Sequence, residues 1–337
     1  MTGPRVAALL PATGSLSATA TAELAEHAER AGFDGVFVPE TWGREAFSRL
    51  GMLAAQTERV TLATGVVSVH SRSPALLAQA IATVDELSSG RATLGVGLSS
   101  PALVESWHGS EFEPALRRQR ETIEIVRAAL SGEPLEYDGR VFDLKHFRLR
   151  FEPPRSAVPI YVAAQGETNA ELAGGFADGW MPNRIPRSAL PALREHVDRG
   201  AKKQNRSPED VATVPYVTTC VLEDGERARD RCRETIAFYI GGMGDFHFRA
   251  LANHGYRTEA TRIREHWQDG EKDEAVAAVT DELLSEIALA GTPAAVERGL
   301  SAYAAVADTV VTLFPTTASR AEIDETIEHV GAVVNAG

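Results

Sequence analysis

The chain reads Ala28-Glu29-Arg30-Ala31-Gly32-Phe33-Asp34-Gly35-Val36-Phe37-Val38-Pro39-Glu40 where an amphipathic helix meets a short apolar strand. The pattern predicts the helix over 19–31 and the strand over 35–38. Gly32 fits the left-handed conformation that commonly ends a helix, because glycine has no side chain to clash there. A helix that stops on glycine and runs at once into a buried strand is typical of folds in which helices and parallel strands alternate.

The same alternation continues along the whole chain. Eight apolar runs are predicted to be strands, at 5–10, 35–38, 60–66, 92–96, 159–164, 179–182, 213–221 and 308–313. Helices are predicted at 19–31, 45–57, 74–88, 114–131, 167–176, 187–204, 225–290 and 319–334. Eight such repeats within 337 residues favour an α/β fold of the closed (β/α)8 TIM-barrel type over an open doubly wound sheet.

Three segments exceed a minimal barrel. Residues 98–113 follow the fourth predicted strand, and the helical block 225–290 follows the seventh. Residues 133–158 contain Asp138-Gly139, a typical turn of a small hairpin. Long loops that follow the strands of a barrel lie at its C-terminal rim, where substrates bind. We therefore expect one domain over 1–337 with its active site on this rim.

The amino-acid composition and the net charge exclude several classes of binding partner. The chain has 34 Lys and Arg against 47 Asp and Glu, a formal net charge of −13, which opposes binding to nucleic acid and to anionic membrane surfaces. Two cysteines are too few for a disulfide framework, and the nine histidines lack metal-ligand spacing. No apolar run approaches the roughly 18 residues of a membrane helix, and no complete signal sequence is visible. We expect a cytoplasmic protein without a metal.

Polar residues follow the second and third predicted strands at the ends that would meet on the rim. Glu40 and Thr41 come after the second strand, and a carboxylate there can orient or protonate a substrate, or cap the next helix. Gly65 fits a bulge or a close approach of backbone to ligand. His70 is either a polar contact in the cleft or a structural side chain.

Two further candidates follow the fourth and fifth strands. The run 95–100 reads Gly-Val-Gly-Leu-Ser-Ser, which lacks the third glycine of a dinucleotide motif but offers small residues and two hydroxyls to a ligand. The run 165–168 reads Gln-Gly-Glu-Thr and leads straight into a helix. Free N–H groups of that first turn would form a nest for a phosphate, or Thr168 is simply an N-terminal cap.

Several motifs in order resemble the bacterial luciferase-like oxidoreductases. They occupy 28–40, 87–97, 99–109, 159–164, 177–180, 241–244 and 291–293. Within that superfamily they most resemble the branch that uses the deazaflavin coenzyme F420, which includes methylene-tetrahydromethanopterin reductase and a deazaflavin-type glucose-6-phosphate dehydrogenase. The resemblance implies a TIM barrel that binds one F420 at its C-terminal mouth, in a homodimer.

The resemblance also implies the residues around the coenzyme. A non-prolyl cis peptide would fall at Gly65-Val66, beside Val67, and support one face of the ring. The phosphate would lie between Leu98-Ser99-Ser100 and Gln165-Gly166-Glu167-Thr168, with Asn183 near the ring or the ribityl chain. Leu98 departs from the threonine of many relatives. Thr41 and Ser100 replace the histidine and glutamate of the sugar dehydrogenases, which disfavours sugar-phosphate oxidation.

The implied reaction is hydride transfer between C5 of F420 and a small organic substrate, with the chain positioning the two reactants. Glu40 is the first candidate to polarise or protonate the substrate, and Thr41, His70 and His108 are further hydrogen-bonding candidates. One alternative is a monooxygenase that uses FMN, and another is a non-catalytic flavin-binding protein.

An anionic coenzyme in a protein of net charge −13 requires a local basic lining. The candidates are Arg117, Arg118, Arg120, Arg184 and Arg187. Solvated helix faces explain these arginines equally well, so the sequence leaves both interpretations open.

Overall fold

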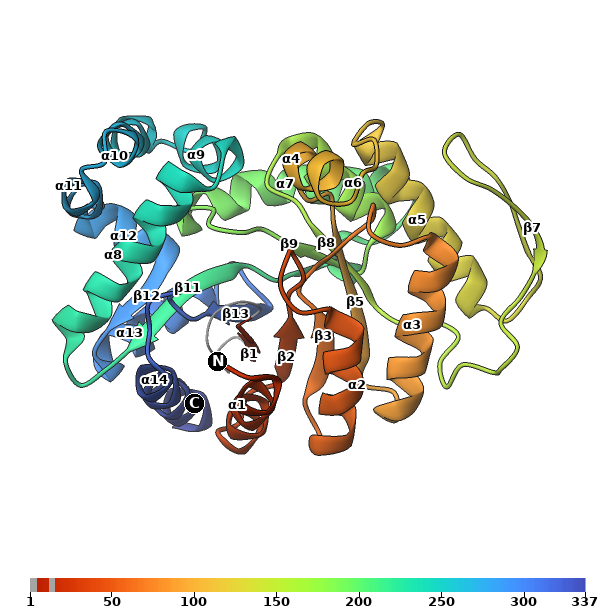
Figure 1. Cartoon of the computed structure of the whole chain (residues 1–337), viewed down its shortest axis with the longest axis horizontal. Coiled ribbons are helices and arrows are strands. Elements are labelled where there is room, and N and C mark those ends of the chain that lie inside the picture. Colours follow the sequence, from red (N-terminus) through yellow and green to blue (C-terminus); the bar gives the residue numbers. More distant parts are fainter. Residues whose placement is uncertain (1–4, 12–15, 337) are drawn as a thin grey trace.

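The computed structural model describes residues 5–11 and 16–336, and parallel strands lie at its centre (Figure 1). The strands of the main sheet are β1 (Arg5–Leu9), β2 (Gly35–Val38), β3 (Thr61–Thr64), β4 (Val67–Ser68), β5 (Ala92–Gly97), β8 (Ile160–Ala163), β9 (Gly179–Met181), β10 (Ala212–Thr213), β11 (Tyr216–Val221), β12 (Ala288–Gly291) and β13 (Thr309–Leu313). Their order is β10-β9-β8-β5-β3-β2-β1-β13-β11-β12, with β4 paired to β5.

The sheet closes into a barrel through the segment that holds β10 and β11. On one side of this segment β10 pairs with β9, and on the other side β11 pairs with β13. A further bridge joins Asn183, just beyond β9, to Tyr216. β12 is added outside the circle, next to β11. The predicted TIM barrel is therefore confirmed, with β3 and β4 as one position and β10 and β11 as another.

Side chains of the strands alternate between the interior of the barrel and the surrounding helices. Val36 and Val38 face outward into the large core under the helices, whereas Phe37 between them points into the barrel. The interior cluster also holds Tyr216 and Leu313, two residues of neighbouring strands. The period of two in these short apolar runs is what positions one set of side chains toward the mouth.

Helices surround the barrel and cover the outer faces of its strands. They are α1 (Ala18–Arg30), α2 (Ala46–Gln56), α3 (Pro74–Leu87), α4 (Pro101–Ser106), α5 (Ala115–Leu130), α6 (Glu167–Phe176), α7 (Leu190–Lys203), α8 (Gly225–Gly242), α9 (Asp245–Ala252), α10 (Arg257–Gln268), α11 (Lys272–Ala277), α12 (Asp281–Ile287), α13 (Pro293–Tyr303) and α14 (Arg320–Ala336), with short 3-10 turns η1 (Arg187–Ala189) and η2 (Pro208–Asp210). Ser17 and Ser73 cap α1 and α3 by accepting backbone N–H groups. Gly32 follows α1 at φ +95°, as its position predicts.

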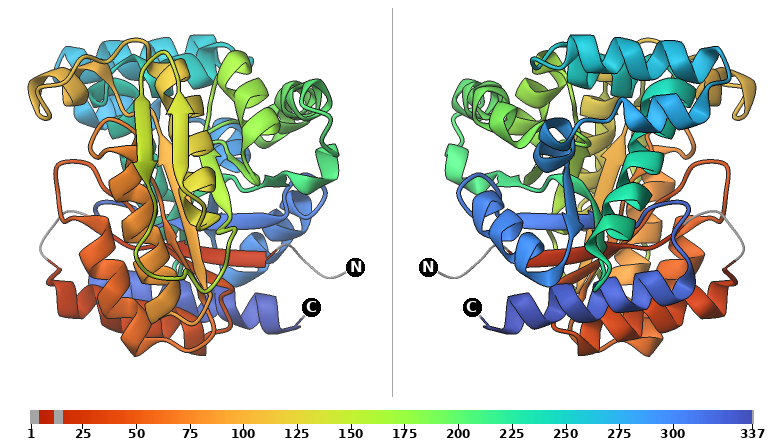
Figure 2. Two further views of the ribbon diagram at one scale, coloured as in Figure 1. Left: turned by 90° about the vertical axis from the view of Figure 1, so that its right-hand side faces the viewer. Right: turned by 90° about the vertical axis from the view of Figure 1, so that its left-hand side faces the viewer.

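The predicted hairpin is also confirmed. β6 (Leu135–Asp138) and β7 (Asp143–Phe147) pair antiparallel and lie on the outer side of the barrel (Figure 2, left). The buried carboxylate of Glu121 on α5 accepts three backbone N–H groups of the turn, from Arg140, Val141 and Phe142. This single side chain thus fixes the hairpin against the helix that precedes it.

Three predicted boundaries were wrong. The helical block 225–290 ends in a strand, β12, because pairing with β11 overrides the local helical pattern. The strand predicted over 213–221 is divided at Pro215, which has no N–H to donate to a neighbouring strand. The strand predicted over 60–66 ends at Thr64, and the following Gly65-Val66 peptide bond is cis.

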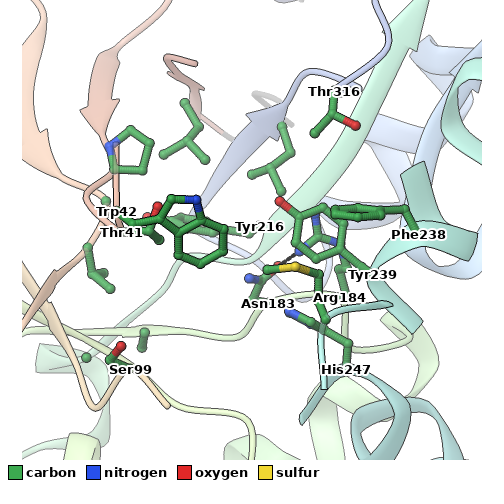
Figure 3. Close-up of a pocket in the computed structure, with 18 of the residues that line it drawn as sticks. Thr41, Trp42, Ser99, Asn183, Arg184, Tyr216, Phe238, Tyr239, His247 and Thr316 are labelled. Carbon is green, nitrogen blue, oxygen red and sulfur yellow. Dashed lines mark hydrogen bonds between the residues drawn. The ribbon is translucent and has the colours of Figure 1, made fainter. Parts of the chain in front are cut away.

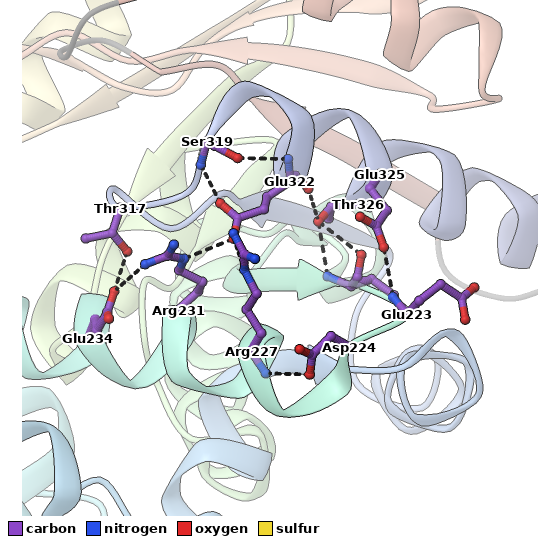
Figure 4. A network of polar contacts seen from close by, with 11 residues as sticks. Glu223, Asp224, Arg227, Arg231, Glu234, Thr317, Ser319, Glu322, Glu325 and Thr326 are labelled. Atoms are coloured by element: carbon purple, nitrogen blue, oxygen red, sulfur yellow. Dashed lines mark hydrogen bonds and ion pairs between the residues drawn. The ribbon is translucent and has the colours of Figure 1, made fainter.

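An ion-pair cluster joins the insertion to the last helix (Figure 4). One carboxylate oxygen of Glu322 on α14 accepts from Arg227 at 2.8 Å and from Arg231 at 3.1 Å, both on α8. The other oxygen accepts the Ser319 N–H at 2.6 Å. Burial alone would raise the pKa of Glu322, but the Ser319 hydrogen bonds and the two guanidinium groups lower it to about 2.

Because the pKa of Glu322 is lower in the folded chain than its usual 4.5, its contribution to stability is present above pH 4.5 and is lost as the pH falls toward 2. Glu322→Gln is expected to cost about 2 kcal/mol of unfolding free energy at pH 7. The difference from the unsubstituted protein should shrink below pH 4, measured by urea unfolding. Glu325→Gln on the same helix is the control, and an equal loss there would contradict the assignment.

Candidate active site

A pocket of about 750 Å³ opens at the C-terminal mouth of the barrel (Figure 3). The barrel contributes residues that follow β2, β3, β5 and β9, together with Tyr216 of β11 and Leu313 of β13. The insertion contributes the opposite wall, from α8 to α11. The pocket therefore lies on the rim that the sequence analysis predicts, between the barrel and its longest insertion.

Six of the predicted site residues line this pocket: Glu40, Thr41, Gly65, Val66, Ser99 and Asn183. Gly65 has no room for a side chain, since a Cβ there would lie 2.8 Å from the Tyr216 hydroxyl oxygen and 2.9 Å from Phe37 Cβ. Val66 follows it, at the cis peptide. The end of the third strand thus brings backbone and a small apolar side chain to the pocket.

The predicted phosphate turn lies beside the pocket rather than in its lining. Gln165 donates from Nε2 to the carbonyl oxygen of Asn183 at 2.9 Å, so the turn is joined to a residue of the lining. Gly166, Glu167 and Thr168 are exposed at the start of α6. Thr168 makes no cap hydrogen bond to this helix, which has no side-chain cap. The first-turn N–H groups there are available to an anion.

Three other predicted contacts are placed differently. Ser100 caps α4, where its hydroxyl accepts the Leu103 N–H at 3.3 Å. Leu98 packs against the hydrophobic core, and Val67 is buried within it. None of the three belongs to the pocket lining, so their expected contacts to a coenzyme remain predictions.

The two predicted histidines, His70 and His108, lie outside the pocket lining, so their contacts to a substrate remain predictions. His70 donates from Nε2 to the Phe112 carbonyl oxygen at 2.9 Å and stacks on the Phe112 ring. Burial lowers the pKa of His70, so the ring is neutral. His108 lies just past the end of α4. The alternative interpretation of His70, a structural side chain, agrees with this geometry.

Glu40 is held in an ion pair at the rim. Arg72 donates to both of its carboxylate oxygens, at 2.6 and 2.8 Å, and the Ala46 N–H donates to one of them at 3.0 Å. Arg72 also binds Glu45 at 2.5 Å. These three hydrogen bonds fix the position of the Glu40 carboxylate at the rim.

Sequence reasoning missed the aromatic wall on the insertion side. Phe238, Tyr239, Met243, His247 and Trp267 line the pocket from α8, α9 and α10. The aromatic residues themselves did not indicate a pocket, because aromatic residues on a helix more often belong to a hydrophobic core. The one indication in the sequence was that the insertion follows a barrel strand, where loops commonly carry functional residues. Burial, with a smaller contribution from the charge of Arg184, lowers the pKa of His247 to about 3, so this histidine is neutral.

Of the predicted basic candidates, Arg184 lines the pocket. The side chain is 4% exposed and donates from Nη1 to Asn183 Oδ1 at 3.1 Å. Its guanidinium carbon lies 3.5 Å from the centre of the Tyr239 ring. Arg117, Arg118, Arg120 and Arg187 are absent from the pocket lining, which favours the alternative that helix faces explain them.

Among the described residues there is neither a metal site nor a membrane-spanning helix. No group of three or more His, Cys, Asp or Glu side chains among residues 5–11 and 16–336 is placed to hold a metal ion. No helix in the part of the chain that the structure describes is long and apolar enough to cross a membrane.

Comparisons with known proteins agree with the fold. A provisionally named coenzyme F420-dependent oxidoreductase of Mycobacterium tuberculosis is 33% identical over 319 residues, 89% of this chain and 91% of the relative. The 5,10-methylenetetrahydromethanopterin reductase of Archaeoglobus fulgidus is 33% identical over 272 residues, 79% of this chain and 80% of the relative. The coenzyme F420-dependent tetrahydromethanopterin reductase of Methanopyrus kandleri superposes with a TM-score of 0.86 at 23% identity, over 100% of this chain and 99% of that one.

The match to a family covers most of the chain. The sequence pattern described as luciferase-like monooxygenase matches residues 3–310. The resemblance drawn from the motifs is thereby confirmed, and the two relatives at 33% identity extend over at least 79% of the chain. The chain belongs to the luciferase-like monooxygenase family.

Proposed function

We propose that this protein is an F420-dependent oxidoreductase that transfers a hydride between C5 of the deazaflavin and a small organic substrate. The observation that carries the proposal is the pocket at the barrel mouth, with Val66 in its lining and the α6 turn beside it. An apolar pocket suits a planar ring, and a helix start with free N–H groups suits a phosphate. The relative at 33% identity that is named as a coenzyme F420-dependent oxidoreductase supports the same cofactor.

The residues divide into two groups around the cofactor. Ser99 and the first-turn N–H groups of Gly166, Glu167 and Thr168 would bind the phosphate, and Asn183 would contact the ribityl chain or the ring edge. Val66 would support one face of the ring. When bound, F420 supplies the hydride chemistry. The chain positions the substrate against the exposed ring face and excludes water.

Glu40 and Thr41 are proposed to contact the substrate. Both line the pocket, and Glu40 enters it as a carboxylate held by Arg72. In that state Glu40 accepts a hydrogen bond from a substrate hydroxyl or amine and orients it, whereas the Thr41 hydroxyl can donate.

The proposal also includes the class of substrate, the location in the cell and the oligomeric state. The substrate is a small molecule, consistent with a pocket of about 750 Å³ and with a net charge of −13, which opposes binding to nucleic acid. The protein acts in the cytoplasm, which suits a chain with only two cysteines. It forms a homodimer, as the family resemblance implies.

The test uses the whole chain and both cofactors. Purified protein is titrated with F420 and, separately, with FMN, and binding is followed by fluorescence and absorbance. We expect saturation by F420 and weaker binding of FMN. The F420 complex, oxidised or reduced, is then mixed with unsaturated carbonyls, imines and alcohols. Preferential binding of FMN would favour the monooxygenase alternative, and a bound F420 that no substrate reduces or oxidises would favour a non-catalytic binding protein.

A further inference from the structure

A buried positive charge in the pocket wall has no counter-ion. Arg184 is 4% exposed, and no carboxylate oxygen of the described residues lies within 4.0 Å of its guanidinium. The residues outside the described ranges include no Asp or Glu. By contrast, Arg72 on the same rim has two carboxylate partners. Burial of an unpaired charge is costly, so its retention calls for a partner that the chain itself does not supply.

Three buried polar atoms in this part of the pocket, one of them on Arg184 itself, also lack hydrogen-bond partners within the described part of the chain. Its Nε has no hydrogen-bond partner, and the same holds for the Tyr216 hydroxyl and His247 Nδ1 among the described residues. All three side chains line the same pocket. The Tyr239 ring joins them, 3.5 Å from the Arg184 guanidinium carbon and 5.1 Å from the His247 ring (Figure 3). Arg184 also has a left-handed backbone at φ +54°, an uncommon conformation that tends to persist at functional sites.

The carboxylates that line the pocket do not neutralise the positive charge of Arg184. Glu40 is paired with Arg72, and Glu234 is bound by Arg231 and by the Thr317 hydroxyl. Asp273 lines the pocket next to Lys272, which lines it too. The uncompensated charge at the buried end of the wall is therefore positive, and in a desolvated site it attracts an anion strongly.

We infer that Arg184 is the recognition group for a carboxylate on the substrate, with the Tyr216 hydroxyl and His247 as additional hydrogen-bonding partners. The same wall also carries apolar side chains, those of Phe238, Met243, Trp267 and Val276. The substrate class is a small organic acid whose body is apolar and whose reacting carbon lies over the deazaflavin ring. This inference rests on the proposed function for the reaction, but the carboxylate site itself can be tested without a cofactor.

The test compares two probes that differ in charge, phenylacetate and the neutral phenylacetamide. Calorimetric titration of the whole protein without cofactor is expected to show phenylacetate binding at least roughly tenfold more tightly, because charge-assisted hydrogen bonds to a buried guanidinium are strong. Arg184→Met should abolish this preference, and Arg184→Lys should keep part of it. Equal affinities for the two probes, or a preference that survives in Arg184→Met, would overturn the inference.

Two further measurements separate the alternatives. If the only role of Arg184 is to support the Tyr239 ring, Arg184→Met should have a lower Tm. The unsubstituted protein should then bind phenylacetate and phenylacetamide equally well, and this result would refute the inference. If Arg184 lacks a native counter-ion, the Tm should stay the same or rise. A loss of F420 affinity in Arg184→Met, without any preference for phenylacetate, would assign the anion to the cofactor and also refute it. Failure of F420 to bind would refute the proposed function and leave the phenylacetate result intact.

Discussion

Gly200→Ala is expected to destabilise the protein by at least about 3 kcal/mol, with Gly174→Ala similar. A Cβ on Gly200 of α7 would lie 1.9 Å from the Glu171 carbonyl oxygen on α6, and a Cβ on Gly174 of α6 would lie 1.8 Å from the Val197 carbonyl oxygen on α7. Both obstacles are backbone atoms, so the two helices must separate. Chemical unfolding of each variant measures the loss.

The control for this prediction is Gly51→Ala. Gly51 lies inside α2, and the nearest atom to an added Cβ is Leu87 Cδ1 at 3.8 Å. Alanine there should be neutral or stabilise the protein by up to about 1 kcal/mol, because glycine is a poor helix former. Because α6 begins at the proposed phosphate turn, Gly200→Ala should also weaken F420 binding. Equal stabilities of the Gly51 and Gly200 variants would contradict the predicted close approach of α6 and α7.

Glu40→Gln is expected to lower kcat roughly 100-fold while F420 affinity changes by less than about threefold. The substitution removes the negative charge from a side chain that lines the pocket and leaves Arg72 without its bidentate partner. Steady-state turnover of the substrate found by screening, together with F420 titration, measures both quantities. Full turnover in a variant that still binds F420 would remove Glu40 from the mechanism.

Two companion variants separate the possible roles of Glu40. Glu45→Gln also loses a partner of Arg72, but Glu45 caps α2 and is absent from the pocket lining. Its kcat should change by less than about threefold, with about 1 kcal/mol lost from the cap. Arg72→Met leaves Glu40 in place without its counter-ion. If Glu40 orients the substrate from the position that Arg72 fixes, kcat should fall as in Glu40→Gln, and an unchanged rate would instead favour Glu40 as the proton donor.

Much of the fold follows from local patterns. The strand over 35–38 has the same bounds in the structure as in the prediction, because a short apolar run between Gly32 and Pro39 leaves little room for error. β12 could not be predicted in this way, because the sequence of Ala288–Gly291 shows no strand pattern. This segment becomes a strand because it pairs with the free edge of β11. Interactions between distant segments decide such elements.

The pocket residues that follow barrel strands could be predicted from the sequence, whereas those on the helices of the insertion could not. Ser99 and Gly65 follow strands, so topology alone brings them to one rim. His70 also follows a strand, yet its side chain turns to the Phe112 carbonyl, and no spacing in the sequence distinguishes the two outcomes. Tyr239 and His247 reach the pocket only through the packing of α8 and α9, which a linear pattern does not encode.

The two-sided construction of the pocket has a consequence for how such enzymes diversify. One wall belongs to the barrel strands, and the other belongs to a segment secured elsewhere, by Glu322 on α14 and by β12 beside β11. Exchanges among Phe238, Met243 and Trp267 therefore leave these two attachments intact. New substrate preferences could therefore arise by a few replacements on that wall, without any change to the residues that the barrel strands contribute.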